Sequence, residues 1–111
     1  KLFGYRGLKG GDEYNLLRAL FLLGPIPIAI DSEHDEFDFY ESGIINITNC
    51  NPENLNHAVL AVGYYLYENP YLLVKNSFGT NWGIGGYFKI ALFENNMCGI
   101  SSWATLPYIS F

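Results

Sequence analysis

The segment from His57 to Asn76 constrains the fold more than any other part of the chain. Residues 57–67 (HAVLAVGYYLY) and residues 71–76 (YLLVKN) are rich in strand-forming residues, and the turn formers Glu68-Asn69-Pro70 separate the two runs. This pattern predicts an antiparallel hairpin. In a hairpin the first residue of one strand lies across from the last residue of the other, so we expect His57 and Asn76 at the same edge of the sheet.

One helix and several further strands are predicted around this hairpin. Asp12 fits a helix N-cap, and apolar residues recur at near-helical spacing from position 14 until Gly24-Pro25 ends the helix. Pro27 indicates that the strand at residues 26–30 lies near a sheet edge or that the proline stands at the start of the strand. The glycine-rich residues 77–86 are expected to form a shaped loop, and the acidic residues 31–41 a solvated one. Strands are expected at residues 26–30, 43–47, 87–92 and 103–109. One helix followed by hairpin-linked strands predicts an α+β domain with an antiparallel sheet or half-barrel.

The composition excludes several classes of function. The chain has 111 residues, a net charge of −5 and only six scattered Lys and Arg residues, which argues against nucleic acid and against an anionic membrane surface as partners. The apolar segment 19–30 is too short to span a bilayer and is broken by Gly24 and two prolines. The start of the chain, Lys1-Leu2-Phe3-Gly4, reads as the interior of a longer sequence, so we expect a fragment or a processed product.

The two cysteines, Cys50 and Cys98, belong to no metal-binding motif, so we expect no metal site and no cofactor. Taken alone they are compatible with two buried thiols or with one disulfide bond. A sequon, Asn46-Ile47-Thr48, makes Asn46 a candidate glycosylation site and hints at secretion.

His57 and Asn76 gain meaning as a pair. A histidine at the start of a buried strand is usually a hydrogen-bonded structural residue, and an asparagine at a strand end is usually a turn former. Side by side, however, an amide oxygen can accept a hydrogen bond from one imidazole nitrogen and leave the other nitrogen free to face a nucleophile. This is the orienting arrangement of a catalytic triad.

Several motifs, in order, resemble the second half of the papain-like cysteine proteases of the cathepsin L and K group. The motifs are LNHAVLAVGY, VKNSFGTNWGIGGYFKI, the helix and strand within GYRGLKGGDEYNLLRALFLLGPIPIAID, FDFYESGI and NNMCGISSWATLPY. The resemblance implies that residues 1–111 are the C-terminal, β half-barrel domain of a thiol endopeptidase. It also implies that His57 is the general base and that Asn76 holds its ring.

The same resemblance assigns further residues. It implies a disulfide between Cys50 and Cys98, and hence a lysosomal, vesicular or secreted location. It makes Phe78 the shield of the His–Asn hydrogen bond. The implied substrate-binding residues are Ala29, Leu55, Asn56, Ala58, Trp82 and Trp103. Trp82 would wall the downstream side of the cleft. Trp103 would make one pocket shallow, the pocket that binds the second substrate residue upstream of the scissile bond. This pocket would then favour Val or Leu over Phe. The alternative is that Trp103 is part of the core.

Three departures from the family pattern carry consequences. The family's tryptophan is replaced by Phe78, and a family glycine is replaced by Tyr65, which would cost about 1–2 kcal/mol if that position required a positive φ. The nucleophile motif Q-G-x-C-G-S/A-C-W is absent.

The missing nucleophile leads us to expect the chain to be inactive alone and to need the N-terminal, cysteine-bearing half of the same enzyme as its partner. The further partners implied are peptide or protein substrates, a propeptide and cystatin-type inhibitors. The alternative is a non-catalytic relative or an inactive truncated fragment that acts as a binding or storage protein.

Overall fold

The structure is a computed structural model that describes the backbone of residues 2–7 and 12–109 and the side chains of residues 12–104. In chain order its elements are β1 (Leu2–Gly7), α1 (Glu13–Leu23), β2 (Ile26–Ile30), α2 (Asp35–Asp38), β3 (Ile44–Ile45), β4 (His57–Tyr65), β5 (Tyr71–Lys75), β6 (Tyr87–Ala91), the 3₁₀ turn η1 (Met97–Gly99) and β7 (Thr105–Ile109).

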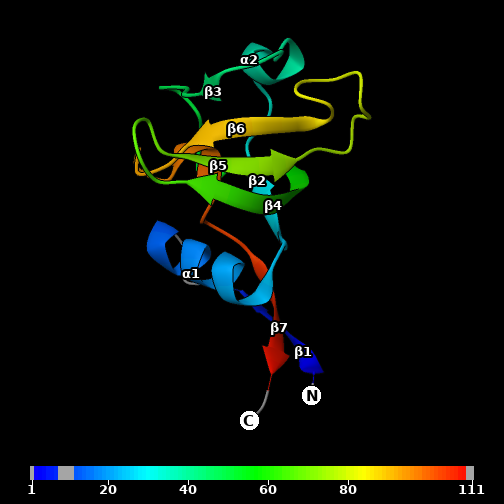
Figure 1. The fold of residues 1–111 in the computed structure, drawn as a ribbon, viewed down its shortest axis with the longest axis vertical. Helices are drawn as coiled ribbons and strands as arrows, with labels where there is room; N and C mark the ends of the chain where they lie inside the picture. Colours follow the sequence, from blue (N-terminus) through cyan, green and yellow to red (C-terminus); the bar gives the residue numbers. More distant parts are fainter. Residues whose placement is uncertain (1, 8–11, 110–111) are drawn as a thin grey trace.

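A five-stranded sheet forms the body of the molecule, in the order β2-β4-β5-β6-β3. Its pairs are antiparallel except for the short pair of β3 with β6, which is parallel. The antiparallel pair β1–β7 forms a separate ribbon at one end of the molecule (Figure 1). The α+β prediction is confirmed, and the main sheet is open rather than closed. In the part of the chain that the structure describes, no helix has both the length and the apolar character needed to cross a membrane.

Helix α1 begins and ends where the sequence predicts. The side chain of Asp12 accepts a hydrogen bond from the backbone N–H of Asn15 at 3.0 Å, which caps the first turn. Gly24 has a φ of 86°, and its N–H donates to the carbonyl of Leu20 at 3.0 Å. The helix packs beside β2 and β4 (Figure 1).

The core lies between the inner face of the sheet and the elements that cover it. Alternate residues of the strands point inward, as a sheet with one buried face requires. The fully buried large side chains include Leu16, Ile26, Ile28, Ile30, Phe37, Leu72, Val74, Phe88 and Ile90. Strand β2, which carries Pro27, is an edge strand, so the prediction from that proline is confirmed.

The structure corrects several expectations. The acidic segment 31–41 is not simply a solvated loop, because it contains α2, and Asp31 and Phe37 in it are buried. Strand β1 was not anticipated. Tyr65 is the last residue of β4 and does not have a positive φ, so the condition under which it would strain the backbone is not met. Only Ile44–Ile45 of the expected segment 43–47 forms a strand.

A disulfide bond joins Cys50 to Cys98, which are 48 residues apart. The bond attaches the loop before β4 to η1. Packing there is tight, because a Cβ added to Gly99 would lie 2.7 Å from Leu55 and 2.8 Å from the carbonyl oxygen of Pro52. The disulfide therefore fixes the loop that leads into His57.

Loss of this disulfide should lower stability. Because a bond that closes a loop of this length contributes about 4 kcal/mol in the chain-entropy model, we expect the Cys50→Ala, Cys98→Ala double variant to unfold at markedly lower denaturant concentration than the wild type. Peptide mapping without reduction should recover one cross-linked peptide pair. Two free thiols in protein that was never reduced would contradict this prediction.

Candidate active site

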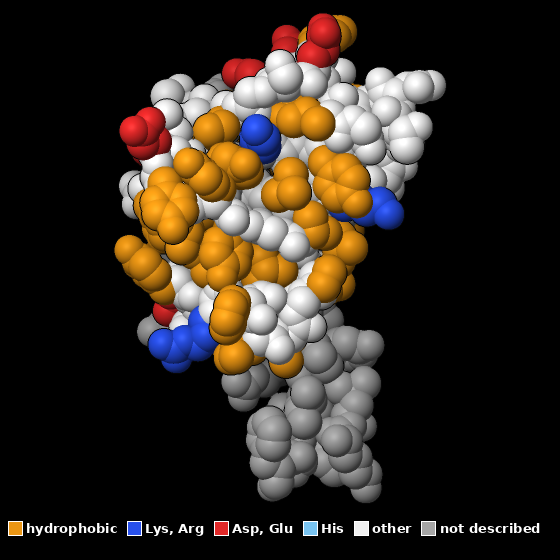
Figure 2. All heavy atoms as spheres, in the orientation of Figure 1, with side chains coloured by type: hydrophobic (Ala, Val, Ile, Leu, Met, Phe, Trp, Pro, Cys, Tyr) orange, Lys and Arg blue, Asp and Glu red, His pale blue; other side chains and the backbone are white. Residues whose placement is uncertain are grey.

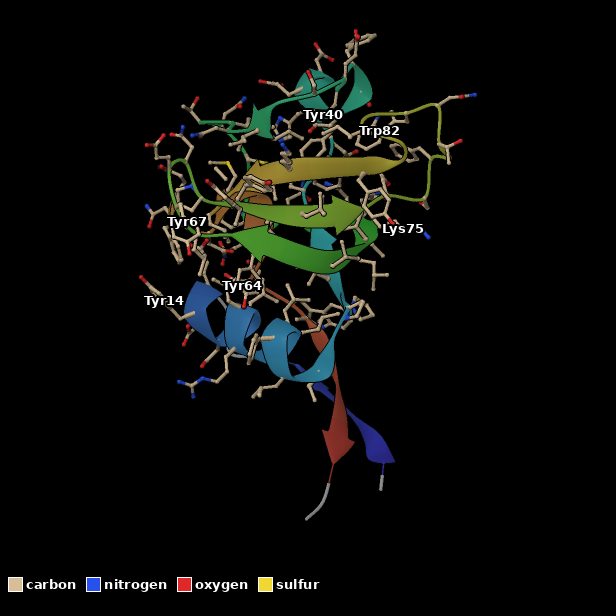
Figure 3. The ribbon with its side chains drawn as sticks, viewed as in Figure 1. Tyr14, Tyr40, Tyr64, Tyr67, Lys75 and Trp82 are labelled. Carbon is tan, nitrogen blue, oxygen red and sulfur yellow. A yellow bond between two sulfur atoms is a disulfide. The ribbon has the colours of Figure 1, made fainter. Side chains whose placement is uncertain are left out.

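His57 and Asn76 meet at one end of the β4–β5 hairpin. The hairpin register pairs Leu60 with Lys75, and a bulge follows at Ala61–Gly63. Continuing that register, His57 lies two positions beyond the residue that faces Asn76, so the predicted direct opposition is wrong. The two side chains nevertheless meet diagonally, with His57 Nε2 2.7 Å from Asn76 Oδ1. Lys75, labelled in Figure 3, marks the end of β5 from which Asn76 follows.

The hydrogen bonds of Asn76 determine the tautomer of His57. Asn76 Oδ1 also accepts a bond from the backbone N–H of Ser77 at 2.8 Å. Because a backbone N–H can only donate, the atom that faces His57 is the oxygen, and Nε2 therefore carries the proton of that bond. In the neutral ring Nδ1 is then the unprotonated nitrogen. No hydrogen bond to Nδ1 occurs within the described residues.

Asn76 is well suited to orient an imidazole because it is itself held firmly. Its side chain is 6% exposed. Its backbone N–H donates to the carbonyl of Gly86 at 2.9 Å, at the far end of the glycine-rich loop. The arrangement leaves an oriented histidine with one basic nitrogen free to accept a proton.

An aromatic row covers one face of the His57 ring. Phe78 stacks on the imidazole with ring centroids 5.2 Å apart and planes 27° apart. Trp82 meets Phe78 edge to face at 5.4 Å. Phe78 is 51% exposed, and His57 beneath it remains partly exposed, so the cover of the ring is incomplete.

Trp82 is held in turn by the segment around α2. Its Nε1 donates to the carbonyl of Phe37 at 2.9 Å, and its ring lies 5.4 Å from Tyr40 and 5.7 Å from Phe88. Tyr40 and Trp82 lie next to one another beside α2 (Figure 3). Sequence reasoning overlooked this supporting role, for which the aromatic residues of FDFY within an acidic segment were the available signal.

Three of the residues expected to bind substrate, Ala29 on the edge strand β2, Ala58 on β4 and Trp103 before β7, lie together at this edge of the sheet. Ala29 faces Ala58 across the β2–β4 pair, and its N–H donates to the carbonyl of Trp103 at 3.3 Å. Trp103 is 48% exposed, which excludes its alternative interpretation as plain core. Leu55 packs beside Gly99.

A shallow hollow of ≈ 440 Å³ lies against β2, β4 and the end of β5, next to the His–Asn pair. Its lining residues are Pro27, Ala58, Val59, Leu60, Lys75, Asn76 and Ser77. The candidate glycosylation residue Asn46 lies elsewhere, exposed just after β3.

A buried carboxylate, that of Asp31, directly follows Ile30, the residue that pairs with His57. Asp31 is 2% exposed and accepts hydrogen bonds from Asn51 N at 2.9 Å, His34 Nε2 at 2.8 Å, Asn56 Nδ2 at 2.7 Å and Glu33 N at 3.3 Å. Burial by itself would raise the pKa of Asp31, but the four hydrogen bonds outweigh it and lower the pKa to about 2. The carboxylate therefore stays ionised in all but strongly acidic solution.

Asp31, His34 and Cys50 offer ligand atoms within 4.8 Å of one another. They do not fit a metal ion, because the Cys50 sulfur is bonded to Cys98 and supplies no thiolate.

Comparison with known proteins gives a consistent result. A family model described as papain family cysteine protease matches residues 1–108. A cathepsin L-like peptidase of Aedes aegypti is 46% identical over 108 residues, which are 96% of this chain and 32% of that protein. Testin-2 of Mus musculus is 48% identical over 104 residues, covering 89% of this chain and 31% of that protein.

The fold is also that of a solved relative. The structure of digestive procathepsin L 3 of the Tenebrio molitor larval midgut matches with a TM-score of 0.90 and 40% identity, over 98% of this chain and 36% of that chain. The chain therefore spans about a third of the length of these relatives.

The low pKa of Asp31 makes stability depend on pH in a defined direction. Since the folded-state pKa of about 2 lies below the ordinary value of 3.8, the ionised carboxylate stabilises the folded state above about pH 4, and this contribution is lost as the pH falls toward 2. We expect Asp31→Asn to lower the Tm of the full-length protein at about pH 5 and to flatten the fall in Tm between about pH 4 and 2. Asp38→Asn, which removes an exposed carboxylate from α2, should keep the wild-type pH dependence. An unchanged acid transition in Asp31→Asn would contradict the prediction.

Proposed function

Since this chain belongs to the papain family of cysteine proteases, we propose that it is the domain of a thiol endopeptidase that supplies histidine and asparagine to a Cys/His/Asn site. The observation that carries the proposal is the 2.7 Å hydrogen bond from His57 Nε2 to the buried oxygen of Asn76, which leaves Nδ1 unprotonated and free of protein partners within the described residues.

In this proposal His57 acts as base and then as acid. Nδ1 takes the proton of a cysteine thiol, and the thiolate attacks the carbonyl carbon of the scissile peptide bond. The imidazolium returns the proton to the leaving amine as the C–N bond breaks, which leaves a thioester. Nδ1 next takes a proton from water, whose oxygen attacks the carbonyl carbon of the thioester. The C–S bond then breaks, the imidazolium returns its proton to the sulfur, and the acid product leaves the regenerated thiol. Throughout, Asn76 Oδ1 keeps the ring oriented.

The nucleophile has to come from outside this chain. Its only two cysteines, Cys50 and Cys98, are bonded to each other. The proposed source is the N-terminal, cysteine-bearing half of the same protein, without which residues 1–111 would be inactive.

The surface supports such a partner, because hydrophobic side chains are spread across the face that Figure 2 shows. Large apolar side chains of α1 are strongly exposed, with Tyr14 at 73%, Phe21 at 76% and Leu22 at 68%. Extensive exposed apolar surface of this kind is typical of interfaces.

The proposed substrates are peptides or proteins. Ala29, Leu55, Ala58 and Trp103 would form the pocket for the second residue upstream of the cut, and Trp82 would wall the downstream side. A half-exposed Trp103 at this edge would leave the pocket shallow. A shallow pocket favours Val or Leu over Phe as the substrate residue that it binds. The disulfide is consistent with a lysosomal, vesicular or secreted location, and a propeptide and cystatin-type inhibitors are the further partners that we propose.

A second candidate function is that of a non-catalytic, binding or storage relative. The favouring observation is the incomplete cover that Phe78 gives to His57. The sequence of the N-terminal half decides between the two functions, because only an enzyme requires the cysteine nucleophile in that half.

Substitution of the pair tests the proposal in the full-length protein. We expect His57→Ala to abolish turnover of a fluorogenic dipeptide amide, because the base and the charge partner of the thiolate are lost together. We expect Asn76→Ala to be milder, since the imidazole remains but samples unproductive orientations. The measurement is kcat/KM. Asn81→Ala, an exposed asparagine of the same loop, is the matched control and should keep wild-type values. Wild-type turnover in His57→Ala would make His57 a structural residue and favour the second candidate.

A larger aromatic side chain at position 78 should not impair the enzyme. We expect Phe78→Trp to leave kcat/KM equal or higher, because a wider ring excludes water better from a hydrogen bond whose net contribution is about 0.5–1.5 kcal/mol. The gain should therefore stay within about tenfold. Phe39→Trp, at a 79%-exposed position outside the aromatic row, should have no effect. A loss of activity confined to Phe78→Trp would contradict this prediction. It would show that the size of the side chain at position 78 matters more than the cover it gives to His57.

A further inference from the structure

Asp31 and Asn56 continue the strand pairing that ends at the active-site histidine. The last pair of the β2–β4 ladder is Ile30 with His57. The backbone N–H of Asn56 still donates to the carbonyl of Ile30 at 2.9 Å. One position further, Asn56 Nδ2 donates to Asp31 Oδ1 at 2.7 Å. A side-chain hydrogen bond thus closes the ladder directly beside His57.

Asp31, which accepts this bond, is itself held in place by several hydrogen bonds. Besides its four side-chain hydrogen bonds, its own backbone N–H donates to the carbonyl of Cys98 at 2.9 Å. Cys98 is bonded to Cys50, and Asn51, the next residue, donates its N–H to the Asp31 carboxylate at 2.9 Å. Position 31 is therefore tied to β2, to η1 and to the loop before β4. The titratable groups that face it are His34 and, through Asn56, Glu33.

The amide of Asn56 is fully occupied within the protein, although the residue is exposed. Its Oδ1 accepts two bonds from Ser32, from the backbone N–H at 3.0 Å and from the hydroxyl at 3.4 Å. Its Nδ2 lies within 3.0 Å of Asp31 Oδ1, Glu33 Oε1 and the carbonyl of Asn54. No hydrogen-bonding capacity of this amide is left for a substrate, which argues against the substrate-binding role expected for its side chain.

We propose that Asp31, acting through Asn56, is a positioning residue for His57, and that the Asn56 side chain orients the base instead of binding substrate. The proposal rests on the proposed function. Its physical basis is that a general base has to lie within hydrogen-bond reach of the proton that it removes, and a displacement of about 1 Å can cost about 100-fold in rate.

The two roles of Asn56 predict different kinetics. A substrate contact that is lost raises KM, whereas a misplaced base lowers kcat and leaves KM unchanged. In the full-length protein, normalised by active-site titration with a thiol reagent, we expect Asp31→Asn and Asn56→Ala each to lower kcat by about tenfold or more, with KM within about twofold of the wild type. The double variant should be no worse than the more impaired single variant, because both substitutions break one connection.

The matched control is Asn51→Ala. It removes the Asn51 Oδ1 bond to Glu53 N in the same loop but keeps the backbone N–H that Asp31 accepts, and it should retain wild-type kcat. An equal fall of kcat in Asn51→Ala would mean that loop stability alone is being measured, and would overturn the proposal. A rise in KM at unchanged kcat in Asn56→Ala would return Asn56 to the substrate contacts and also overturn it.

A second measurement does not depend on turnover. The Nε2 proton of His57, bonded to Asn76 Oδ1, should give a slowly exchanging downfield NMR signal that His57→Gln removes. We expect the signal to broaden or vanish in Asp31→Asn and Asn56→Ala and to persist in Asn51→Ala. Persistence in all three variants would refute the positioning role. If the wild-type protein shows no turnover, the proposed function fails, but this signal still decides the positioning question. If Asp31→Asn does not fold, Asn56→Ala decides it.

Discussion

The hydrogen bond between His57 and Asn76 is the interaction on which the candidate site depends. Asn76 Oδ1 accepts from both the imidazole and the Ser77 backbone, so the amide cannot flip without losing two bonds. That double acceptance fixes the proton on Nε2 and leaves Nδ1 as the basic nitrogen. The bond is short and its acceptor is buried, which makes it stronger than the same contact in water.

Two separate parts of the fold converge on this bond. From one side the aromatic row of Phe78 and Trp82 covers the ring, and Trp82 is itself anchored to the carbonyl of Phe37 beside α2. From the other side the disulfide-linked loop leads into β4, where Asn56 bonds to the buried Asp31. The acidic segment 31–41 contributes to both supports, so its aromatic and carboxylate side chains have structural roles beyond solubility.

In the proposed function the site is half of a catalytic apparatus. His57 would be its oriented base, and the nucleophile would come from outside the chain, because both cysteines of the chain form the disulfide. The open sheet and the exposed apolar side chains of α1 leave surface for a second domain to cover. The chain belongs to the papain family of cysteine proteases and spans about a third of the length of the relatives it matches.

The sequence by itself determined the α+β class, helix α1 with its Asp12 cap, strand β2 and the presence of His57 and Asn76 at one sheet edge, because local periodicity and capping chemistry encode such features. Only the tertiary structure decided how the two side chains meet, because a bulge at Ala61–Gly63 sets the register and no local pattern announces it. The burial of Asp31 and the anchoring of Trp82 were likewise decided by contacts across 20 to 45 residues of chain. Hydrogen bonds over such separations depend on how elements pack, and packing is a property of the whole fold rather than of any one segment.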